Sequence, residues 1–311
     1  MNTSPIKLSI VIPVYFNELN IPHTVPRLQN LQMIMPEYDL EFIFVDDGSK
    51  DKSFSLLKMA RETDSRIKVI KLSRNFGSMN AIQAGLIHAT GDCIGIISAD
   101  LQDPPEMFKE MVLKWQEGKK VVMATRADRE ESASQKAFSN TYYYLLEKYA
   151  LKGYPKGGFD FVLIDKQVAK EVTSIHEKNT NVMGLIYWLG HDTEMMPYVR
   201  QERKLGESKW TLSKKIKLFI DSFVSFSYSP IRFMSFIGFV TACLSILYGL
   251  FVIVCNISGI IDMEGWTTII ALITFLLGII MVMLGIIGEY LWRILDESRG
   301  RPAYVIDEVY K

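Results

Sequence analysis

Two long runs without a charged residue, close together near the end of the sequence, constrain the fold more than any other feature. They span Phe233–Ile261 and Gly265–Gly288, and each exceeds the roughly 20 residues that a helix needs to cross a bilayer. No comparable run occurs in the first 230 residues. This pattern excludes a many-spanning transporter and disfavours a purely soluble protein. It predicts a main domain followed by a two-helix membrane hairpin.

The residues around these runs predict the orientation of the hairpin. Arginines flank its outer ends, at Arg232 and at Arg293, Arg299 and Arg301, whereas the connection Asp262-Met263-Glu264 has no Lys or Arg. The positive-inside rule then places both flanks, and with them both termini, in the cytoplasm. A helical hairpin buried in a soluble core is the alternative, but two runs of this length would overfill such a core.

Within the hairpin, Gly278, Gly285 and Gly288 are expected to permit close approach of the helices, and Glu289 is expected to pair with Arg293. The segment before the hairpin is basic and then apolar. Its basic part holds Arg200, Arg203, Lys204, Lys209, Lys214, Lys215 and Lys217 against Glu202 and Glu207. The apolar stretch 218–228 with scattered serines follows, which favours binding at a membrane surface over an ordinary solvated helix face.

The first 200 residues alternate apolar strands with helical patterns. The expected strands are Leu8–Val14, Leu40–Asp46, Ile67–Leu72, Cys93–Ser98, Val121–Thr125 and Phe159–Ile164. The expected helices between them include Ser53–Thr63, Met79–Ala89, Glu106–Glu117 and Gln135–Tyr149. Nearly continuous apolar strands are typical of a sheet covered on both faces. The pattern predicts an α/β domain with a mostly parallel sheet whose strands and helices all precede Ser229.

Charge and cysteine content exclude several classes of protein. The 35 Lys and Arg residues balance 35 Asp and Glu residues, which argues against a basic nucleic-acid binder and against an acidic disordered tail. Three cysteines, Cys93, Cys243 and Cys255, show neither metal-ligand spacing nor a disulfide framework. The segment Met1–Leu8 has no apolar core of a cleavable signal peptide.

Polar motifs follow four of the expected strands, where open α/β sheets bind their ligands. They are Tyr15-Phe16-Asn17-Glu18, Asp46-Asp47-Gly48-Ser49, Ser73-Arg74-Asn75-Phe76-Gly77 and Ser98-Ala99-Asp100-Leu101-Gln102-Asp103. Neither phosphate-binding glycine motif, G-x-x-x-x-G-K-[ST] or G-x-G-x-x-G, is present. Carboxylates at strand ends suit a nucleotide held by hydrogen bonds, with its diphosphate on a divalent cation. Taken singly, Asp46–Ser49 is equally typical of a turn, and Asp103-Pro104-Pro105 of a helix start.

Together these motifs resemble family 2 glycosyltransferases of the GT-A fold. More narrowly, the chain resembles the membrane-anchored polyprenyl-phosphate glycosyltransferases, a group with dolichol-phosphate mannose synthase and bactoprenol glucosyltransferases. The resemblance also rests on Ile12-Pro13-Val14-Tyr15, Pro104-Pro105-Glu106, Gly206-Glu207-Ser208-Lys209-Trp210, Gly285-Ile286-Ile287-Gly288-Glu289-Tyr290 and Arg301-Pro302-Ala303-Tyr304.

The resemblance implies a GT-A catalytic domain over residues 1–210, an amphipathic juxtamembrane segment over 211–230, two transmembrane helices within 231–292 (about 233–257 and 267–290) and a cytoplasmic tail over 293–311. It implies an inverting enzyme that moves a hexose from a nucleotide sugar, UDP-glucose or a similar UDP-hexose, to undecaprenyl phosphate at the cytoplasmic face of a bacterial inner membrane. A homotetramer is also implied. The alternatives are a GDP-mannose-dependent mannosyltransferase, a processive polysaccharide synthase, whose Gln-x-x-Arg-Trp motif is absent, and an inactive membrane scaffold.

For the donor site, the resemblance implies that Pro13, Tyr15 and Asp46 border the nucleotide base, with Asp47 on base or ribose. Glu18 and Arg74 complete the nucleotide-binding residues. Asp100 and Gln102 would hold Mg²⁺ or Mn²⁺, with Ser98 as a weak third ligand.

For transfer, the resemblance implies catalytic roles for four residues and a phosphate-binding and acceptor loop made of four more. The catalytic residues are Asp100, Arg126, Arg129 and Asp160, and the loop residues are Arg200, Arg203, Ser208 and Lys209. Asp160 would face the acceptor, either as a base or as an orienting group. Two positions depart from the family pattern: Ser98 replaces the first Asp of the usual Asp-x-Asp, and Val162 stands where an Arg is usual.

Overall fold

The computed structural model describes residues 5–100, 102–128, 133–175, 177–178, 181–201, 212–258 and 265–310. The chain divides into two compact units. The first comprises Met1–Ser225 together with Pro302–Lys311, and the second comprises Phe226–Arg301. The two units are described separately below.

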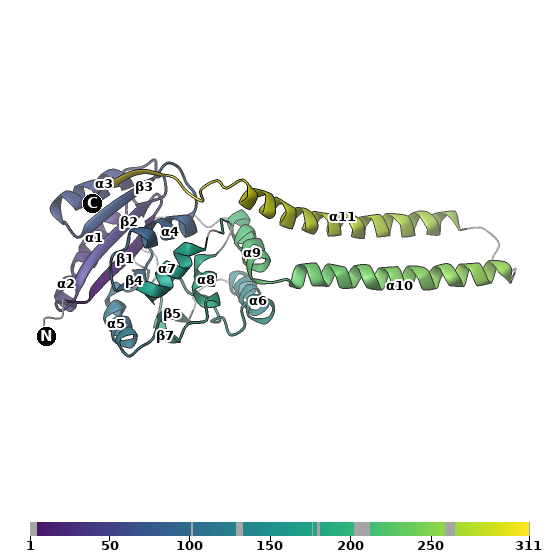
Figure 1. Ribbon diagram of the computed structural model, residues 1–311, viewed down its shortest axis with the longest axis horizontal. Helices are drawn as coiled ribbons and strands as arrows, with labels where there is room; N and C mark the ends of the chain where they lie inside the picture. The colour runs from purple at the N-terminus through teal and green to yellow at the C-terminus, as the bar shows by residue number, and fades with distance from the viewer. Residues whose placement is uncertain are drawn as a thin grey trace. The chain divides into compact units, whose positions relative to one another are not determined.

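The first unit is built on an eight-stranded mixed sheet with the order β7-β5-β6-β4-β1-β2-β3-β8 (Figure 1). Its strands are β1 (Lys7–Val14), β2 (Asp39–Asp46), β3 (Ile67–Leu72), β4 (Cys93–Ile96), β5 (Val121–Asp128), β6 (Phe161–Asp165), β7 (Thr193–Val199) and β8 (Ile306–Tyr310). The pairs β1–β2, β1–β4, β2–β3 and β5–β7 are parallel, and β4–β6, β5–β6 and β3–β8 are antiparallel. The expected α/β class with a mostly parallel sheet is confirmed.

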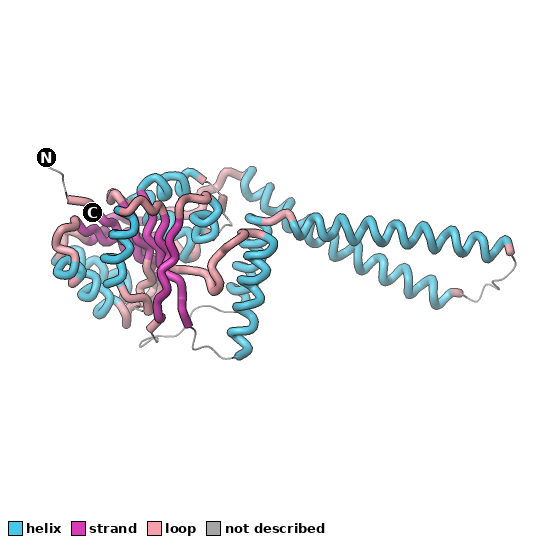
Figure 2. The backbone as a smooth tube through the Cα atoms, turned by 90° about the horizontal axis from the view of Figure 1, so that it is seen from below, coloured by secondary structure: helices cyan, strands magenta, loops and turns pink. Residues whose placement is uncertain are grey.

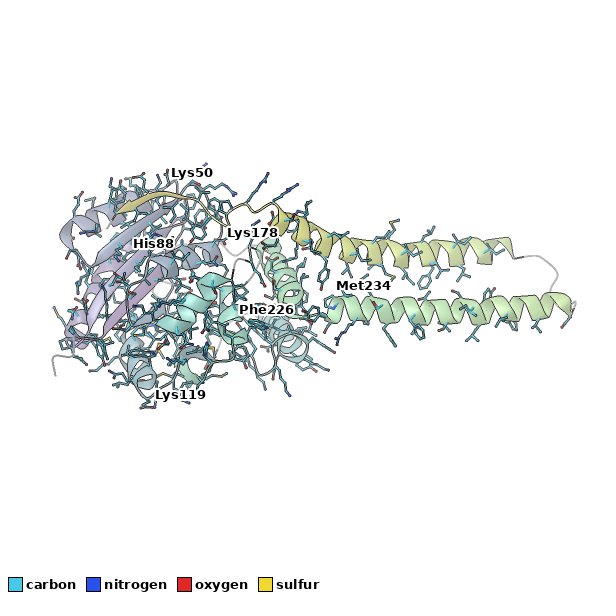
Figure 3. The ribbon with its side chains drawn as sticks, viewed as in Figure 1. Lys50, His88, Lys119, Lys178, Phe226 and Met234 are labelled. Atoms are coloured by element: carbon cyan, nitrogen blue, oxygen red, sulfur yellow. The ribbon has the colours of Figure 1, made fainter. Side chains whose placement is uncertain are left out.

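Strand direction decides which residues meet at each edge of this sheet. Six strands (β1 to β5 and β7) run the same way, because β6 reverses direction after β4 and β5 reverses it again. Their carboxyl ends therefore share one edge with the amino ends of β6 and β8. We call this end of the strands the carboxyl edge, as distinct from the edge strands β7 and β8. Lys50, which follows the carboxyl end of β2, and Lys119, which precedes the amino end of β5, lie far apart in Figure 3.

Helices cover both faces of the sheet (Figure 2). They are α1 (Ile21–Gln29), α2 (Leu31–Ile34), α3 (Ser53–Thr63), α4 (Ser78–His88), the 3₁₀ turn η1 (Pro105–Met107), α5 (Phe108–Gln116), α6 (Ala133–Tyr149), α7 (Lys166–Ser174), α8 (Val182–Trp188) and α9 (Leu212–Phe226). Helices α4 and α7 pack on one face. Helix α5 packs on the other, where fully buried Phe108 stacks edge-on against Phe161 of β6. Burial of this kind is the main stabilising contribution to the fold.

The six expected strands and four expected helices are present, with ends shifted by three residues or fewer. Strands β7 and β8 were not expected, nor were α1, α2, α7 and α8. The expectation that every strand precedes Ser229 is wrong, because β8, which follows the hairpin in the sequence, pairs with β3. Strand β7 contains Pro197, which lacks an N–H. Because β7 is an edge strand, with a neighbour on one side only, a proline is tolerated there.

The second unit consists of two long helices, α10 (Ser229–Ile257) and α11 (Trp266–Ser298). At 1.5 Å per residue they are about 44 and 50 Å long, more than the roughly 30 Å hydrocarbon core of a bilayer. The stretches Ser229–Phe251 and Phe275–Ser298 are long and apolar enough to cross a membrane. The assignment of 211–230 to the membrane surface and of 231–292 to a membrane hairpin stays a prediction, and the acidic connection 262–264 lies outside the described residues.

Two expectations about this unit have different outcomes. The ion pair between Glu289 and Arg293 is confirmed, with 2.9 Å between Oε1 and Nη2. The prediction that Gly278, Gly285 and Gly288 of α11 permit close packing is not supported, since a Cβ at any of these positions would meet no described atom within 4 Å. Gly238 of α10 is the glycine in close contact, because a Cβ there would lie 3.1 Å from the Cε of Met283.

Candidate active site

The loop after β2 crosses the carboxyl edge and holds the loop after β3. The carboxylate of Asp47, almost fully buried, accepts hydrogen bonds from the backbone N–H of Phe76 at 2.6 Å and of Gly77 at 2.9 Å. Gly48 adopts φ +68°, and a Cβ at this position would lie 2.5 Å from the carbonyl carbon of Arg74. Only glycine permits this approach. The Asp-Asp-Gly motif thus fixes the loop that contains Arg74.

Asp46, the last residue of β2, is the most deeply buried of the predicted nucleotide-binding residues. Its Oδ2 accepts a hydrogen bond from the N–H of Ser49 at 3.2 Å. Its Oδ1 is buried and has no hydrogen-bond partner among the described residues. Burial raises the pKa of this carboxyl group above its usual value, against the opposing hydrogen bonds from Ser49. An unsatisfied buried oxygen costs about 1–3 kcal/mol, which a donor N–H from a ligand would recover.

The loop after β1 is fastened to the loop after β2. The N–H of Phe16 donates to Ser49 Oγ at 3.1 Å, and the Phe16 backbone has φ 54°, which is uncommon outside glycine. The Glu18 carboxylate accepts the backbone N–H of Lys52 at 3.0 Å. The carboxylate of Glu18 thus joins the two loops, and its predicted role in nucleotide binding stays a prediction. Tyr15 contacts the Phe16 ring edge-on, with 4.6 Å between ring centroids.

The other two predicted nucleotide-binding residues differ in exposure. Pro13 lies within β1 opposite Val45 of β2 and is partly buried. Arg74 is exposed, and its guanidinium lies 4.1 Å from the centre of the Phe76 ring. The structure therefore brings the ends of β1, β2 and β3 together as the sequence motifs predict.

The predicted metal-binding residues follow β4, and their hydrogen bonds involve a further carboxylate. The Oγ of Ser98 lies 2.7 Å from Asp100 Oδ1 and 2.9 Å from Asp103 Oδ2. Asp103 has no exposed surface. Its Oδ1 accepts a short hydrogen bond from the hydroxyl of Tyr198, and it lies 3.4 Å from Arg200 Nε. The segment predicted to bind metal is thus connected to the end of β7.

Gln102 makes a second connection to the segment after β7. The N–H of Gln201 donates to the Gln102 carbonyl at 2.9 Å, and Gln102 Nε2 donates to the Gln201 carbonyl at 3.3 Å. Arg27 of α1 forms two hydrogen bonds of 2.9 Å with Glu106 and lies 3.5 Å from the side chain of Gln201. These contacts fix where the predicted acceptor loop begins, although Arg203, Ser208 and Lys209 of that loop lie outside the described residues.

Arg126 and Asp160 meet because β5 and β6 are antiparallel. Ala124 of β5 pairs with Phe161 of β6, which places Arg126 beside the residue that precedes β6. Arg126 Nη2 forms a short ion pair with Asp160 Oδ2. Burial disfavours the charged guanidinium, but the charge of Asp160 and the nearby hydroxyls of Tyr198 and Tyr143 outweigh it, so the pKa of Arg126 is raised. Arg129, the other predicted phosphate-facing arginine, lies outside the described residues.

The donor atoms at the end of β4 fit a hard divalent cation by type. Ser98, Asp100 and Gln102 offer hydroxyl, carboxylate and amide oxygens, the ligands that Mg²⁺ and Mn²⁺ prefer. They include one carboxylate, and no group of three or more His, Cys, Asp or Glu side chains with metal-binding geometry occurs within the described part of the chain. A cation held here would take its remaining ligands from water or from a bound diphosphate.

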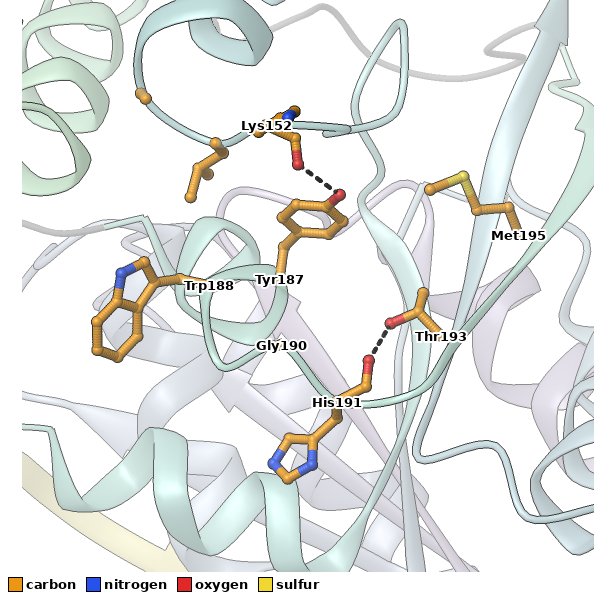
Figure 4. A pocket seen from close by; sticks show the side chains of 9 residues that line it. Lys152, Tyr187, Trp188, Gly190, His191, Thr193 and Met195 are labelled. Atoms are coloured by element: carbon orange, nitrogen blue, oxygen red, sulfur yellow. Dashed lines mark hydrogen bonds between the residues drawn. The ribbon is translucent and has the colours of Figure 1, made fainter.

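A surface cavity of about 460 Å³ lies away from these residues (Figure 4). Its lining includes Tyr187, Trp188, His191 and Thr193. Thr193 is the first residue of β7, so the cavity is at the opposite edge of the sheet from Asp100 and Asp160. None of the predicted site residues lines it.

Two contributors to the site were not recognised from the sequence. Tyr198 was missed because β7 was missed, and Asp103 was interpreted only as part of a helix start. The signal for both was weak. Tyr198 follows a proline in a short edge strand, and its partner lies 95 residues earlier in the chain.

Comparison with known proteins identifies the family of the chain. Residues 9–173 match the family model described as "Glycosyl transferase family 2". The uncharacterized glycosyltransferase YkcC of Bacillus subtilis is 39% identical over 98% of this chain and 94% of its own length. A bactoprenol glucosyl transferase of Shigella phage SfV is 34% identical over 96% of this chain and 98% of its own.

A solved structure shares the fold. The mannosyltransferase PcManGT from Pyrobaculum calidifontis, in complex with GDP-Man and Mn²⁺, aligns with a TM-score of 0.50 and 16% identity. The alignment covers 72% of this chain and 64% of that one, somewhat under two thirds of its length. The region matched by the family model, residues 9–173, contains most of β1, all of β2 to β6 and the residues Asp46, Asp100 and Asp160. The chain therefore belongs to glycosyl transferase family 2.

Proposed function

We propose that this enzyme transfers a hexose from a nucleotide sugar to a polyprenyl phosphate at a membrane surface. One observation carries the proposal: a single chain combines a family 2 glycosyltransferase domain with two helices long and apolar enough to cross a bilayer. Its similarity along nearly the whole chain to a protein named bactoprenol glucosyl transferase supports the same acceptor.

The proposed donor is a UDP-hexose, with UDP-glucose favoured. The buried Oδ1 of Asp46 lacks a partner among the described residues, and an N–H on the edge of a nucleotide base would supply one. Tyr15 and Pro13 border the same end of β1, and Arg74 is exposed on the neighbouring loop. The panel of donors described below distinguishes UDP from GDP sugars.

Transfer is proposed as a single displacement with inversion. A bond forms between an acceptor phosphate oxygen and the anomeric carbon, while the bond from that carbon to the donor diphosphate breaks and the nucleoside diphosphate leaves. A divalent cation at Asp100 and Gln102 would supply positive charge for the departing diphosphate. Arg126 and Arg200 add fixed positive charge at the same edge of the sheet. Arg129, Arg203, Ser208 and Lys209 are proposed to face the donor or lipid phosphates.

The acceptor does not require a strong base. A phosphate monoester has its second pKa near 6, so at neutral pH its attacking oxygen is already ionised. Asp160 is ion-paired with Arg126, which suits a group that fixes the arginine and the acceptor in position. We propose that Asp160 orients the acceptor and does not remove a proton from it.

The membrane arrangement follows from the acceptor, whose isoprenoid chain stays in the bilayer. The hairpin would hold the catalytic unit at the cytoplasmic face of a bacterial inner membrane, with both termini in the cytoplasm, and the basic segment 200–217 would face the anionic lipid surface. We also propose that the enzyme assembles as a homotetramer.

The test is a transfer assay with the full-length protein in membranes or detergent. Labelled UDP-glucose, UDP-galactose, UDP-N-acetylglucosamine and GDP-mannose are offered with undecaprenyl phosphate and Mg²⁺ or Mn²⁺, and the products are extracted into organic solvent. We expect label in the organic phase only when the lipid phosphate and a cation are both present. Label released into water without lipid, or a long sugar polymer, would contradict the proposed acceptor.

A further inference from the structure

Asp103 is a buried carboxylate that the proposed reaction does not use directly. Its side chain has no exposed surface, and a carboxylate buried in this way costs several kcal/mol unless it is paired and hydrogen-bonded. The two residues that follow, Pro104 and Pro105, have no N–H to donate, and the turn η1 has no side-chain cap. Asp103 therefore does not serve as an ordinary helix cap.

The partners of Asp103 are side chains from two distant strand ends. Ser98 follows β4, whereas Tyr198 and Arg200 are at and after the end of β7. Strands β4 and β7 are not neighbours, because β6 and β5 lie between them in the sheet. Asp103 thus joins two parts of the carboxyl edge that the backbone pairing of the sheet does not join.

The connection continues from Asp103 to the predicted metal ligand. The single hydroxyl proton of Ser98 is shared between the two carboxylates, with Oγ 2.9 Å from Asp103 Oδ2 and 2.7 Å from Asp100 Oδ1. The same Asp100 oxygen lies 3.3 Å from the N–H of Gln102. Two contacts on one oxygen restrict the rotation of a carboxylate, and a fixed ligand binds a cation better than a mobile one. Loss of such supporting contacts typically lowers metal affinity 10- to 100-fold.

We propose that Asp103 is a positioning residue of the metal site: held by Tyr198 and Arg200, it fixes the Ser98 hydroxyl, which in turn orients the Asp100 carboxylate toward the divalent cation. The inference rests on the proposed function, since it concerns the cation that would bind the donor diphosphate. It gives Ser98 a role other than that of the weak metal ligand predicted from the sequence.

The experiment measures Mn²⁺ binding without turnover. Full-length protein in detergent is titrated with Mn²⁺ in the presence of UDP, and free Mn²⁺ is followed by electron paramagnetic resonance. We expect Ser98→Ala and Asp103→Asn each to weaken Mn²⁺ binding tenfold or more. Ser98→Thr keeps the hydroxyl and is expected to bind within about threefold of the wild-type protein.

A matched control exists at the opposite edge of the same sheet. There the buried Glu41 carboxylate accepts a hydrogen bond from the Ser9 hydroxyl at 2.5 Å. Ser9→Ala removes a buried serine-to-carboxylate contact of the same kind, so it should lower the midpoint of thermal unfolding while leaving Mn²⁺ affinity unchanged.

The outcomes separate the two proposals. If the wild-type protein binds Mn²⁺ with UDP, and Ser98→Ala and Asp103→Asn bind it equally well, the positioning role is wrong while the donor site stands. An equal loss of affinity in Ser98→Thr and Ser98→Ala also overturns it, as does an equal loss in Ser9→Ala. If the wild-type protein binds no Mn²⁺ in the presence of UDP, the metal-dependent donor site fails and the positioning role falls with it. Should Asp103→Asn fail to fold, the comparison of Ser98→Ala with Ser98→Thr decides.

Discussion

Arg126 at the end of β5 forms an ion pair with Asp160, the residue before β6. The pair exists because two antiparallel neighbours bring a carboxyl end and an amino end to the same edge of the sheet. The guanidinium is largely buried, while the Asp160 side chain is 55% exposed. A carboxylate that fixes an arginine in this way can orient an anionic acceptor through that arginine, because the carboxylate itself repels the acceptor phosphate.

Asp160→Asn tests this role through the pH dependence of transfer. We expect the rate to fall at least tenfold, because the amide no longer neutralises and fixes Arg126. The acidic limb of the pH–rate profile should remain near pH 6, because ionisation of the acceptor phosphate governs it. The measurement is kcat for lipid glycosylation between pH 5 and 8. Loss of that limb in the variant would show that Asp160 acts as the base.

Asp46→Asn should reduce nucleotide affinity. The Oδ1 atom of Asp46 is buried without a partner among the described residues, so replacing the carboxylate with an amide weakens its acceptance of a base N–H. We expect UDP to bind at least tenfold more weakly, measured by isothermal titration calorimetry. Asp39→Asn, at the exposed amino end of the same strand, is the control and should bind UDP normally. Equal UDP affinity in the wild-type protein, Asp46→Asn and Asp39→Asn would show that Asp46 does not bind the nucleotide.

The metal motif gives opposite expectations for two substitutions. Asp100→Asn removes the one carboxylate among the predicted ligands and should lower transfer by two orders of magnitude or more, on the order of 3 kcal/mol. Ser98→Asp places a third carboxylate beside Asp100 and Asp103. Because like charges repel, this variant should unfold at a lower temperature without a cation and gain more from added Mn²⁺ than the wild-type protein. Thermal unfolding with and without Mn²⁺ measures the lower midpoint of Ser98→Asp and its larger gain from the cation. Near-normal transfer activity of Asp100→Asn would show that the cation binds elsewhere.

Strand β8 should stabilise the catalytic unit even though it follows the hairpin. Tyr310 of β8 accepts a hydrogen bond from Lys58 Nζ at 3.0 Å, and Lys71 of β3 pairs with Asp307 at 2.9 Å. A stop codon after Val305 removes these contacts and leaves β3 as an open edge. We expect the midpoint of unfolding to fall by several degrees and aggregation to increase. An unchanged midpoint in detergent would show that β8 contributes nothing to stability.

Glu41 should make stability depend on pH below neutrality. Burial alone would raise its pKa, but hydrogen bonds from Lys68, Ser9 and Thr90 outweigh this effect and lower the pKa to about 2. A carboxyl group with a lowered pKa stabilises the folded state above its unfolded value of 4.5, and that stabilisation is lost as the pH falls toward 2. The difference in unfolding midpoint between wild-type protein and Glu41→Gln should therefore shrink from pH 6 to pH 3. A constant difference would contradict the assignment.

The parts of this fold that depend on local pattern could be predicted from the sequence, and those that depend on distant partners could not. Strands β1 to β6 are runs of apolar residues, so composition alone locates them. Strand β7 was missed because Pro197 interrupts the pattern, and β8 because Asp307 and Glu308 make it polar.

The same distinction holds in the site. Motifs at strand ends predicted that Asp46 and Asp100 would share one edge of the sheet. They did not predict that Glu18 would accept the Lys52 backbone N–H, or that Asp103 would meet Tyr198, because both contacts depend on how separate loops pack.

The position of β8 in the chain also orders the events of biosynthesis. A ribosome synthesises both apolar helices before Ile306–Tyr310, so β3 lacks its outer neighbour while the hairpin is being made. The sheet gains its eighth strand only after both helices have left the ribosome. If the helices span a bilayer, they have by then reached the insertion machinery. Completion of the eight-stranded sheet would then be delayed until the protein has reached that bilayer.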